Sequence, residues 1–258
     1  MEIPVNLRNP AQFFAAAGIA AAVELPSRFD INADEGEPSF RASFVLPDFD
    51  LEALLKNLQG AAFREQSEAD GMTYSFDRFN PPVVMTLGQK QIELDWWLNE
   101  FWSDKSSLKT WAGTSTPLSR LKRLTKMISS DTKDIFNEGM LSPAGNRPSW
   151  GFDPRVARNT GVPGRLARVK IYPITELLCA VGLQLCRPVI DKGEITFCAW
   201  RDDLPIELAM IASELDGVRT LALTAQREKR SQGMFTFSSA EFVADLARFA
   251  TDRRFATK

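Results

Sequence analysis

At 258 residues with 44% hydrophobic side chains, the chain is long enough to bury a sizeable core as one large domain or two modest ones. Its net charge is −2. Because it contains no histidine, most classes of hydrolase, nucleases with histidine-bound metal and most zinc sites are excluded. Residues 1–10 lack the features of a secretory signal, and no apolar stretch approaches the roughly 18 residues of a membrane span. The sequence therefore predicts a cytoplasmic protein with no membrane partner.

The N-terminus predicts a strand followed by a buried helix. Residues 3–7 alternate apolar and polar side chains like a short strand. Asn9 and Pro10 are placed to cap and begin an alanine-rich helix over residues 13–25, and the two phenylalanines that open this run should anchor it. We expect these residues to act structurally and not to contact a ligand.

A second strand and helix follow, with an acidic cluster between them. Residues 40–46 alternate like a strand, and residues 50–63 place four leucines on one face of a helix. Asp48, Asp50 and Glu52 stand at the start of this helix, where acids complement the helix dipole. Capping is therefore favoured over magnesium binding, and we predict no metal site.

Two strands over residues 83–87 and 91–98 are separated by "GQK", a short glycine-containing hairpin signal. Its tip should expose Gln89 and Lys90.

Residues 118–136 then predict an amphipathic helix whose leucine and isoleucine face packs inward and whose opposite face is lysine-rich.

Residues 143–170 contain too many glycines and prolines for a regular helix or a central strand. They predict an extended, arginine-rich surface loop, and loops of this length tend to be functional or disordered. Trp150 and Phe152 could stack on bases, but we favour the interpretation that they pin the loop to the core.

The C-terminal part predicts alternating helices and strands. In order, these are a helix over 173–188, a strand over 194–200, a helix over 204–215, a strand over 218–226, a basic turn over 227–233, a strand over 234–237 and a last helix over 238–250. Cys179, Cys186 and Cys198 are expected to be reduced thiols in the core. No nucleotide-binding glycine motif is present, so no cofactor is predicted.

Helices and strands interleave without a regular βαβ rhythm, which predicts an α+β fold with mixed helices, mostly antiparallel strands and an irregular basic loop in the middle. We expect an N-terminal lobe over 1–142 that includes the basic helix 118–136. The arginine-rich loop over 143–170 and a C-terminal lobe over 171–258 follow.

Positive charge is concentrated in the middle of the chain. Residues 105–170 contain 13 Lys and Arg against four Asp and Glu, a local net charge of +9, which leaves 18 basic and 29 acidic residues elsewhere. Segregation on this scale is typical of a polyanion-binding face on an acidic body, because each phosphate neutralised by Lys or Arg releases condensed counterions. The alternative is a set of solvated charges that pair with acids from elsewhere in the fold.

We predict that cationic side chains from two segments grip phosphates. They are Arg120, Lys122, Arg123 and Lys126 on the helix, with Arg147, Arg155, Arg158, Arg165, Arg168 and Lys170 in the loop. Gln89, Lys90 and Asn146 on exposed tips are candidate groove readers or strand-separating wedges, although a solvated turn residue is the favoured interpretation of each. No catalytic residues are predicted.

Three stretches also share a pattern with one family. They read "IPVNLRNPAQFFAAAGI" at 3–19, "LDWWLNEFW…LKTWAGTSTPLSRL" at 94–121 and "GFDPRVARN…YPITELLCAVGLQLCRP" at 151–188. In this order they resemble "PVDLxNPGQFFACCGL", "LDWWxDE…LKxWAGxQ" and "FxFDxRxxR…PAxELLALIGLQRFRP" of a subunit family from CRISPR type I-G (formerly I-U) loci. The chain departs at Ala11, where that pattern has glycine, and at Leu185 and Cys186, where it has aromatic and basic residues.

The resemblance implies a noncatalytic subunit of a Cascade surveillance complex in the role of the large subunit. Such a subunit contacts target double-stranded DNA beside the protospacer, helps to open it into an R-loop and recruits the helicase-nuclease, while guide RNA reads the sequence. The implied partners are therefore target DNA, the guide RNA ribonucleoprotein, other Cascade subunits and the helicase-nuclease.

Two further hypotheses stay open. The chain could be a structural scaffold whose basic segment binds an acidic neighbouring subunit while other proteins hold the nucleic acid. The least favoured is an enzyme that uses magnesium bound by Asp48 and Asp50.

Overall fold

The structure is a computed structural model that describes residues 1–34, 37–66, 80–98, 106, 108–111, 115–143, 149–158, 169–191, 194–213, 220–231, 234–237 and 239–245. Its helices are α1 (Pro10–Val23), α2 (Leu51–Gln59), α3 (Pro117–Thr125), α4 (Pro154–Arg158), α5 (Pro173–Leu185) and α6 (Ile206–Ser213). Its strands are β1 (Glu2–Asn6), β2 (Arg28–Asp34), β3 (Glu37–Val45), β4 (Ala62–Glu65), β5 (Val83–Leu87), β6 (Lys90–Leu94), β7 (Met140–Leu141), β8 (Lys170–Ile171), β9 (Val189–Asp191), β10 (Glu194–Trp200), β11 (Thr220–Ser231), β12 (Met234–Phe237) and β13 (Glu241–Asp245).

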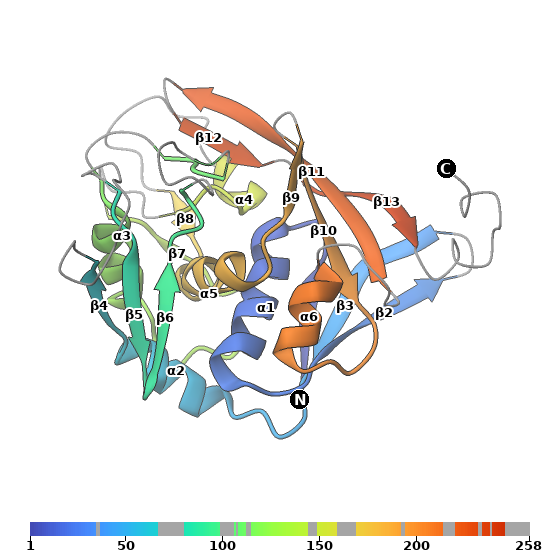
Figure 1. Cartoon of the computed structure of the whole chain (residues 1–258), viewed down its shortest axis with the longest axis horizontal. Coiled ribbons are helices and arrows are strands. Elements are labelled where there is room, and N and C mark those ends of the chain that lie inside the picture. The colour runs from blue at the N-terminus through green and yellow to red at the C-terminus, as the bar shows by residue number, and fades with distance from the viewer. Residues whose placement is uncertain are drawn as a thin grey trace.

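Antiparallel strands in small sheets surround a central helix pair, which confirms the predicted α+β class (Figure 1). One sheet has the order β1-β3-β2, a second has β4-β5-β6, and β7 pairs with β8. The largest has the order β12-β11-β10-β9, with β13 also paired to β11. The predicted hairpin is confirmed, because β5 and β6 pair directly through Leu87 and Lys90.

Helices α1 and α5 lie against each other in the middle of the molecule (Figure 1). Helix α1 is apolar all round and buries twelve of its fourteen residues, as expected for a helix with no polar face. Asn9 caps it by accepting a hydrogen bond from the Ala11 amide at 3.1 Å, and Pro10 begins it, as predicted.

The contact between α1 and α5 depends on two glycines. A Cβ atom at Gly18 would lie 2.0 Å from the carbonyl oxygen of Leu178, and one at Gly182 would lie 1.7 Å from that of Phe14. Both obstacles are helix backbone, which cannot rotate away. The two helices therefore touch backbone to backbone, and only glycine fits at either position.

One hydrophobic core joins the two predicted lobes. The Phe13 ring of α1 lies 4.6 Å from the Phe197 ring of β10, and the Trp200 indole donates to the Ser27 carbonyl oxygen at 2.8 Å. The main hydrophobic cluster contains residues from both sides of the segment 143–170. The parts of the chain before and after this segment therefore share one continuous core.

Three predicted helices are wrong in whole or in part. The helix predicted over 50–63 ends at Gln59, and residues 62–65 form strand β4. Helix α3 ends at Thr125 and not at residue 136. The last part of the predicted helix forms a turn instead, in which the Asp134 side chain accepts hydrogen bonds from the amides of Phe136 and Asn137. Residues 241–245, predicted to be helical, form strand β13, because pairing with β11 prevails over the local helix signal.

Other departures are smaller. The predicted basic turn begins later, since β11 extends to Ser231. The segment 143–170 is not wholly irregular, because it contains the short helix α4 and the fully buried side chains of Trp150 and Phe152. The three cysteines are buried free thiols, as predicted.

Replacing Gly182 with alanine should destabilise the fold by about 3 kcal/mol or more, because the added methyl group must displace helix backbone. For a chain of this size we expect the melting temperature to fall by roughly 5–10 °C in a thermal denaturation experiment. Gly60→Ala is the matched control, since a Cβ there would meet its nearest atom at an ordinary 3.4 Å. Equal melting temperatures for the two variants would contradict the close helix contact.

Candidate nucleic-acid interface

Helix α3 presents cationic side chains to solvent. Thr116 caps it by accepting from the Ser119 amide at 3.2 Å, and Leu121 and Leu124 are fully buried beneath it. Lys122, like Arg123 and Lys126, is exposed on the outer side. The predicted orientation of these three residues is therefore confirmed, and their place near the end of the helix also complements its dipole.

Lys170 directly precedes two residues of a small apolar cluster, Ile171 and Tyr172. It is exposed on β8, and its Nζ is 5.6 Å from the centre of the Tyr172 ring. Met127, which follows α3, packs against this cluster. The segment that follows α3 and strand β8 therefore meet through this cluster. We call Lys122, Arg123, Lys126 and Lys170 the α3–β8 basic surface.

Arg120 does not belong to this surface, which corrects the prediction. Its side chain is only 6% exposed, and its guanidinium carbon lies 5.4 Å and 5.9 Å from the ring centres of Trp111 and Trp150. Nη1 donates to the Ser149 carbonyl oxygen at 2.8 Å. The sequence already indicated that Arg120 faces inward, because it is four residues before Leu124 and therefore shares the apolar face of the helix.

Arg155 is also engaged within the fold. Its guanidinium pairs with Asp153 at 2.6 Å, and Nη1 and Nη2 donate to the Asn137 side chain and the Phe136 carbonyl oxygen at 3.0 and 2.9 Å. The same group lies 3.6 Å from the centre of the Tyr172 ring. These contacts use its planar donor fork, so Arg155 is a structural residue and not the predicted phosphate ligand.

Asp153 connects this arginine to the first helix. It is fully buried and accepts a hydrogen bond from the Asn9 side chain at 3.1 Å, while the Phe152 carbonyl oxygen accepts from the Ala11 amide at 3.2 Å. The N-terminal and "FDPR" stretches quoted above therefore meet at one buried polar junction. Sequence reasoning found the Asn9 cap and missed its partner, although Asp153 is the sole acid among residues 139–170.

Glu176 of α5 fixes the start of the same segment. Its buried carboxylate accepts hydrogen bonds from the Ser149 hydroxyl at 2.6 Å and the Trp150 amide at 2.8 Å. The Trp150 indole donates to the Glu176 carbonyl oxygen at 2.9 Å. Trp150 and Phe152 thus pin the chain to the core, which confirms that interpretation over base stacking.

Burial raises the pKa of Glu176 to about 7, because its carboxylate is removed from water, and nearby Asp153 adds to the effect. Burial also lowers the pKa of Arg120 to about 10, against the attraction of Glu176. Arg120 is therefore protonated at neutral pH, whereas Glu176 titrates there.

The remaining predicted residues lie elsewhere. Gln89 is exposed at the β5–β6 turn, and the Lys90 Nζ donates to the Ala21 carbonyl oxygen at 2.8 Å and to Glu24, where it neutralises the end of α1. This turn is at the lower edge of Figure 1, apart from α3. The structure therefore does not bring Gln89 and Lys90 to the α3–β8 basic surface, and Lys90 stabilises a helix end.

Five predicted residues cannot be placed in the site. Arg158 lies in α4, but its side chain is outside the described part of the structure. Asn146, Arg147, Arg165 and Arg168 lie outside the described residues altogether.

The acidic cluster before α2 is a helix cap, as predicted. The Asp50 side chain accepts a hydrogen bond from the Ala53 amide at 3.0 Å. Among the residues that the structure describes, no three His, Cys, Asp or Glu side chains gather closely enough to hold a metal ion. In the same residues, no helix has both the length and the apolar character needed to cross a membrane.

Replacing Arg155 with alanine should lower the free energy of unfolding by about 3 kcal/mol, because buried Asp153 loses its charge partner. Arg155→Lys should restore little of this stability, since an ammonium cannot reproduce the planar fork. Urea denaturation measures both, with exposed Lys126→Ala as the control that stays within about 0.5 kcal/mol of wild type. An Arg155→Ala variant as stable as this control would show that the junction is not structural.

Glu176→Gln should change how stability depends on pH. The pKa of Glu176 is raised from 4.5 to about 7 in the fold, so its favourable contribution is complete below 4.5 and is lost as pH rises through 7. The glutamine variant does not titrate. Between about pH 5 and pH 8, wild type should therefore lose on the order of 3 kcal/mol relative to the variant in urea denaturation. A Glu176→Gln profile that runs parallel to that of wild type would refute the prediction.

Comparison with known proteins identified no relative of this chain. Family models, curated proteins and solved structures were searched, and none matches the chain. The functional interpretation of the α3–β8 basic surface therefore rests on the residues and contacts of this chain.

Proposed function

We propose that the chain is a noncatalytic nucleic-acid-binding subunit of an RNA-guided CRISPR type I Cascade complex. In this proposal the α3–β8 basic surface holds phosphates of target DNA beside the region that pairs with guide RNA. The observations that carry the proposal are the concentration of positive charge in residues 105–170 and the exposure of Lys122, Arg123 and Lys126 on α3 and of Lys170 on β8. Phosphate contacts of this kind gain free energy by releasing counterions and are independent of sequence.

The buried arginines support the same function indirectly. Arg120 ties α3 to Ser149, and Arg155 ties α4 to the junction beneath α1. These contacts fix the orientation of α3 and α4 within the fold. A surface that is already ordered loses less conformational entropy when it binds DNA.

The wider roles follow from the resemblance to the type I-G subunit family. Guide RNA would read the target sequence, while this subunit would contact backbone and flanking duplex, assist R-loop formation and recruit the helicase-nuclease. The proposed partners are the guide RNA ribonucleoprotein, other Cascade subunits and the helicase-nuclease, in the cytoplasm.

A scaffold function is the second candidate. It is favoured by large apolar side chains on the surface of α6, where Leu208 is 49% and Ile211 57% exposed. Exposed apolar helix faces are typical of protein contacts. The two functions use different surfaces, so one subunit could serve both.

Replacing Lys122 and Lys126 together with alanine should weaken binding of a fluorescent duplex target by about tenfold or more. It should also reduce the slope of log affinity against log salt by about 2, since each phosphate contact contributes about 0.9. A salt titration followed by fluorescence anisotropy measures both quantities.

The matched controls are single substitutions of one positive charge each. Lys126→Ala should reduce both affinity and slope, whereas Lys90→Ala, at the far hairpin, should leave them unchanged. Circular dichroism establishes that each variant is folded. Equal effects of Lys126→Ala and Lys90→Ala, or no effect of the double substitution, would contradict the proposed surface.

A further inference from the structure

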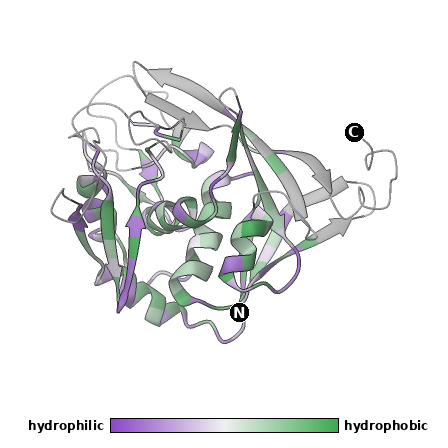
Figure 2. Cartoon of the chain, viewed as in Figure 1, coloured by the Kyte–Doolittle hydropathy of each residue, from purple (hydrophilic) through white to green (hydrophobic). Residues whose placement is uncertain are grey.

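Helix α6 has the composition of a buried helix but buries only one face. Ile206, Ala209 and Ala212 pack inward near β10, whereas Leu208 and Ile211 are 49% and 57% exposed. Figure 2 colours most of this helix as hydrophobic. Such a helix is normally covered on all sides.

Helix α1 shows the contrast within the same chain. It is equally apolar, and its inward and outward faces are both covered, by α5 and the surrounding core. In α6, Glu207 is the one charged side chain, so few polar groups of the helix accompany the exposed Leu208 and Ile211. The physical cost of leaving Leu208 and Ile211 in water points to a protein that covers them.

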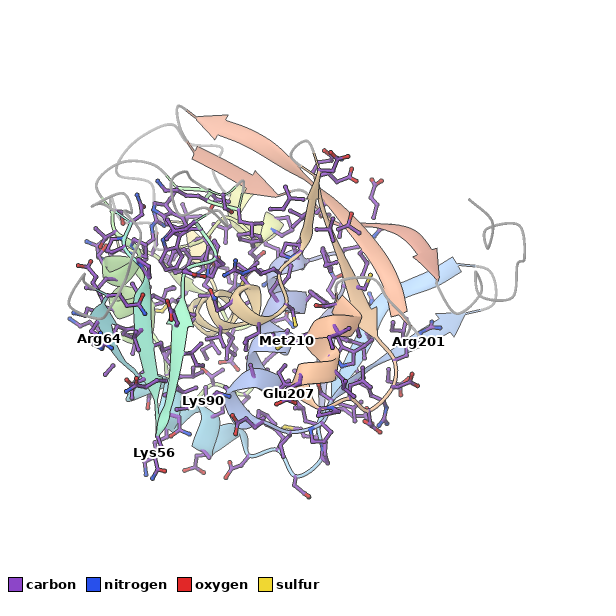
Figure 3. The ribbon with its side chains drawn as sticks, viewed as in Figure 1. Lys56, Arg64, Lys90, Arg201, Glu207 and Met210 are labelled. Carbon is purple, nitrogen blue, oxygen red and sulfur yellow. The ribbon has the colours of Figure 1, made fainter. Side chains whose placement is uncertain are left out.

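Acidic side chains border the exposed apolar face. Asp202 and Asp203 precede α6 and Glu207 lies in its first turn, against one basic residue, Arg201, in the segment 201–213. Asp203 holds Arg28 of β2 at 2.7 Å. Figure 3 labels Arg201 and Glu207 around this helix. With Arg28 counted, the border holds three carboxylates and two guanidinium groups, a net charge of −1.

We propose that the α6 face, defined by Leu208 and Ile211 with the carboxylates of Asp202 and Glu207, docks an amphipathic segment of another protein that carries lysine or arginine beside an apolar stripe. Apolar side chains would cover Leu208 and Ile211, and the basic residues would meet the carboxylates. This partner chemistry follows from the combination of exposed leucine and isoleucine with an acidic border.

The same charges argue against other occupants. Nucleic acid and anionic lipid surfaces are repelled by carboxylates. A second copy docked through its own α6 would bring like charges together. The chain's own basic helix cannot serve as the ligand, because α3 buries Leu121 and Leu124. A basic partner segment from a different protein satisfies both the apolar and the electrostatic requirement.

The proposed docking face is separate from nucleic-acid binding. In Figure 1, α5 and α1 lie between α6 and α3. The inference goes beyond the proposed function and does not rest on it. Loss of partner binding and loss of DNA binding can therefore be measured on the same variants as independent results.

The test uses three labelled synthetic peptides of about 15 residues, the length at which an isolated helix becomes marginally stable. One has leucines on a helical stripe with lysines elsewhere, one has the same composition without a stripe, and one has glutamates in place of the lysines. Fluorescence anisotropy with the full chain should give saturable binding of the first peptide, about tenfold tighter than that of the other two. The Leu208→Ser, Ile211→Ser double variant should lose about tenfold in affinity for it.

Two matched variants separate the contributions. Met140→Ser with Leu141→Ser removes a similarly exposed apolar pair, 42% and 60% exposed on β7, and should leave peptide affinity unchanged. Glu207→Gln should weaken binding severalfold and reduce its salt dependence. DNA affinity should be unchanged in the α6 variants.

Three outcomes would overturn the proposal. The first is equal binding of the lysine peptides with and without a stripe, and the second is equal affinity of wild type and the Leu208→Ser, Ile211→Ser variant. The third is concentration-dependent dimerisation in analytical ultracentrifugation that this variant abolishes, which would identify a second copy as the occupant.

Discussion

The backbone contact between α1 and α5 determines the rest of the architecture. Gly18 and Gly182 allow the two helices to approach until a methyl group would not fit between them. This brings the N-terminal and C-terminal parts of the chain into one core, with Phe13 against Phe197. The described sheets lie around this pair (Figure 1). The basic middle segment lies between the two helices in the sequence.

The described parts of that segment are held by buried acidic side chains. Glu176 accepts the Ser149 hydroxyl and Trp150 amide, and Asp153 joins Asn9 to Arg155. Each carboxylate is fully buried and would be destabilising alone. Their hydrogen bonds, with the Arg120 bond to the Ser149 carbonyl oxygen, hold α3 and α4 against the central helices.

This packing gives the basic residues two different roles. Two arginines are internal ties, and the lysines with Arg123 remain on the surface. Arginine suits the internal role because its planar fork can satisfy several acceptors at once, whereas lysine remains hydrated as a point charge. The candidate DNA surface and the acidic, apolar α6 face thus occupy different parts of the molecule.

Local signals in the sequence determined much of the molecule. The Asn9 and Asp50 caps, the β5–β6 hairpin and the outward lysines of α3 each depend on a few neighbouring residues, so pattern and propensity sufficed. Sequence patterns also indicated that Trp150 and Phe152 would anchor the middle segment. The α+β class followed from the interleaving of these local elements.

Tertiary structure decided the features that depend on distant partners. Residues 241–245 became a strand because β11 offered its edge, and Arg155 became structural because Asp153, Asn137 and Phe136 converge on it. A charged side chain has the same appearance in sequence whether it meets water or a buried carboxylate. The free-energy difference between those environments arises from groups that only folding brings together.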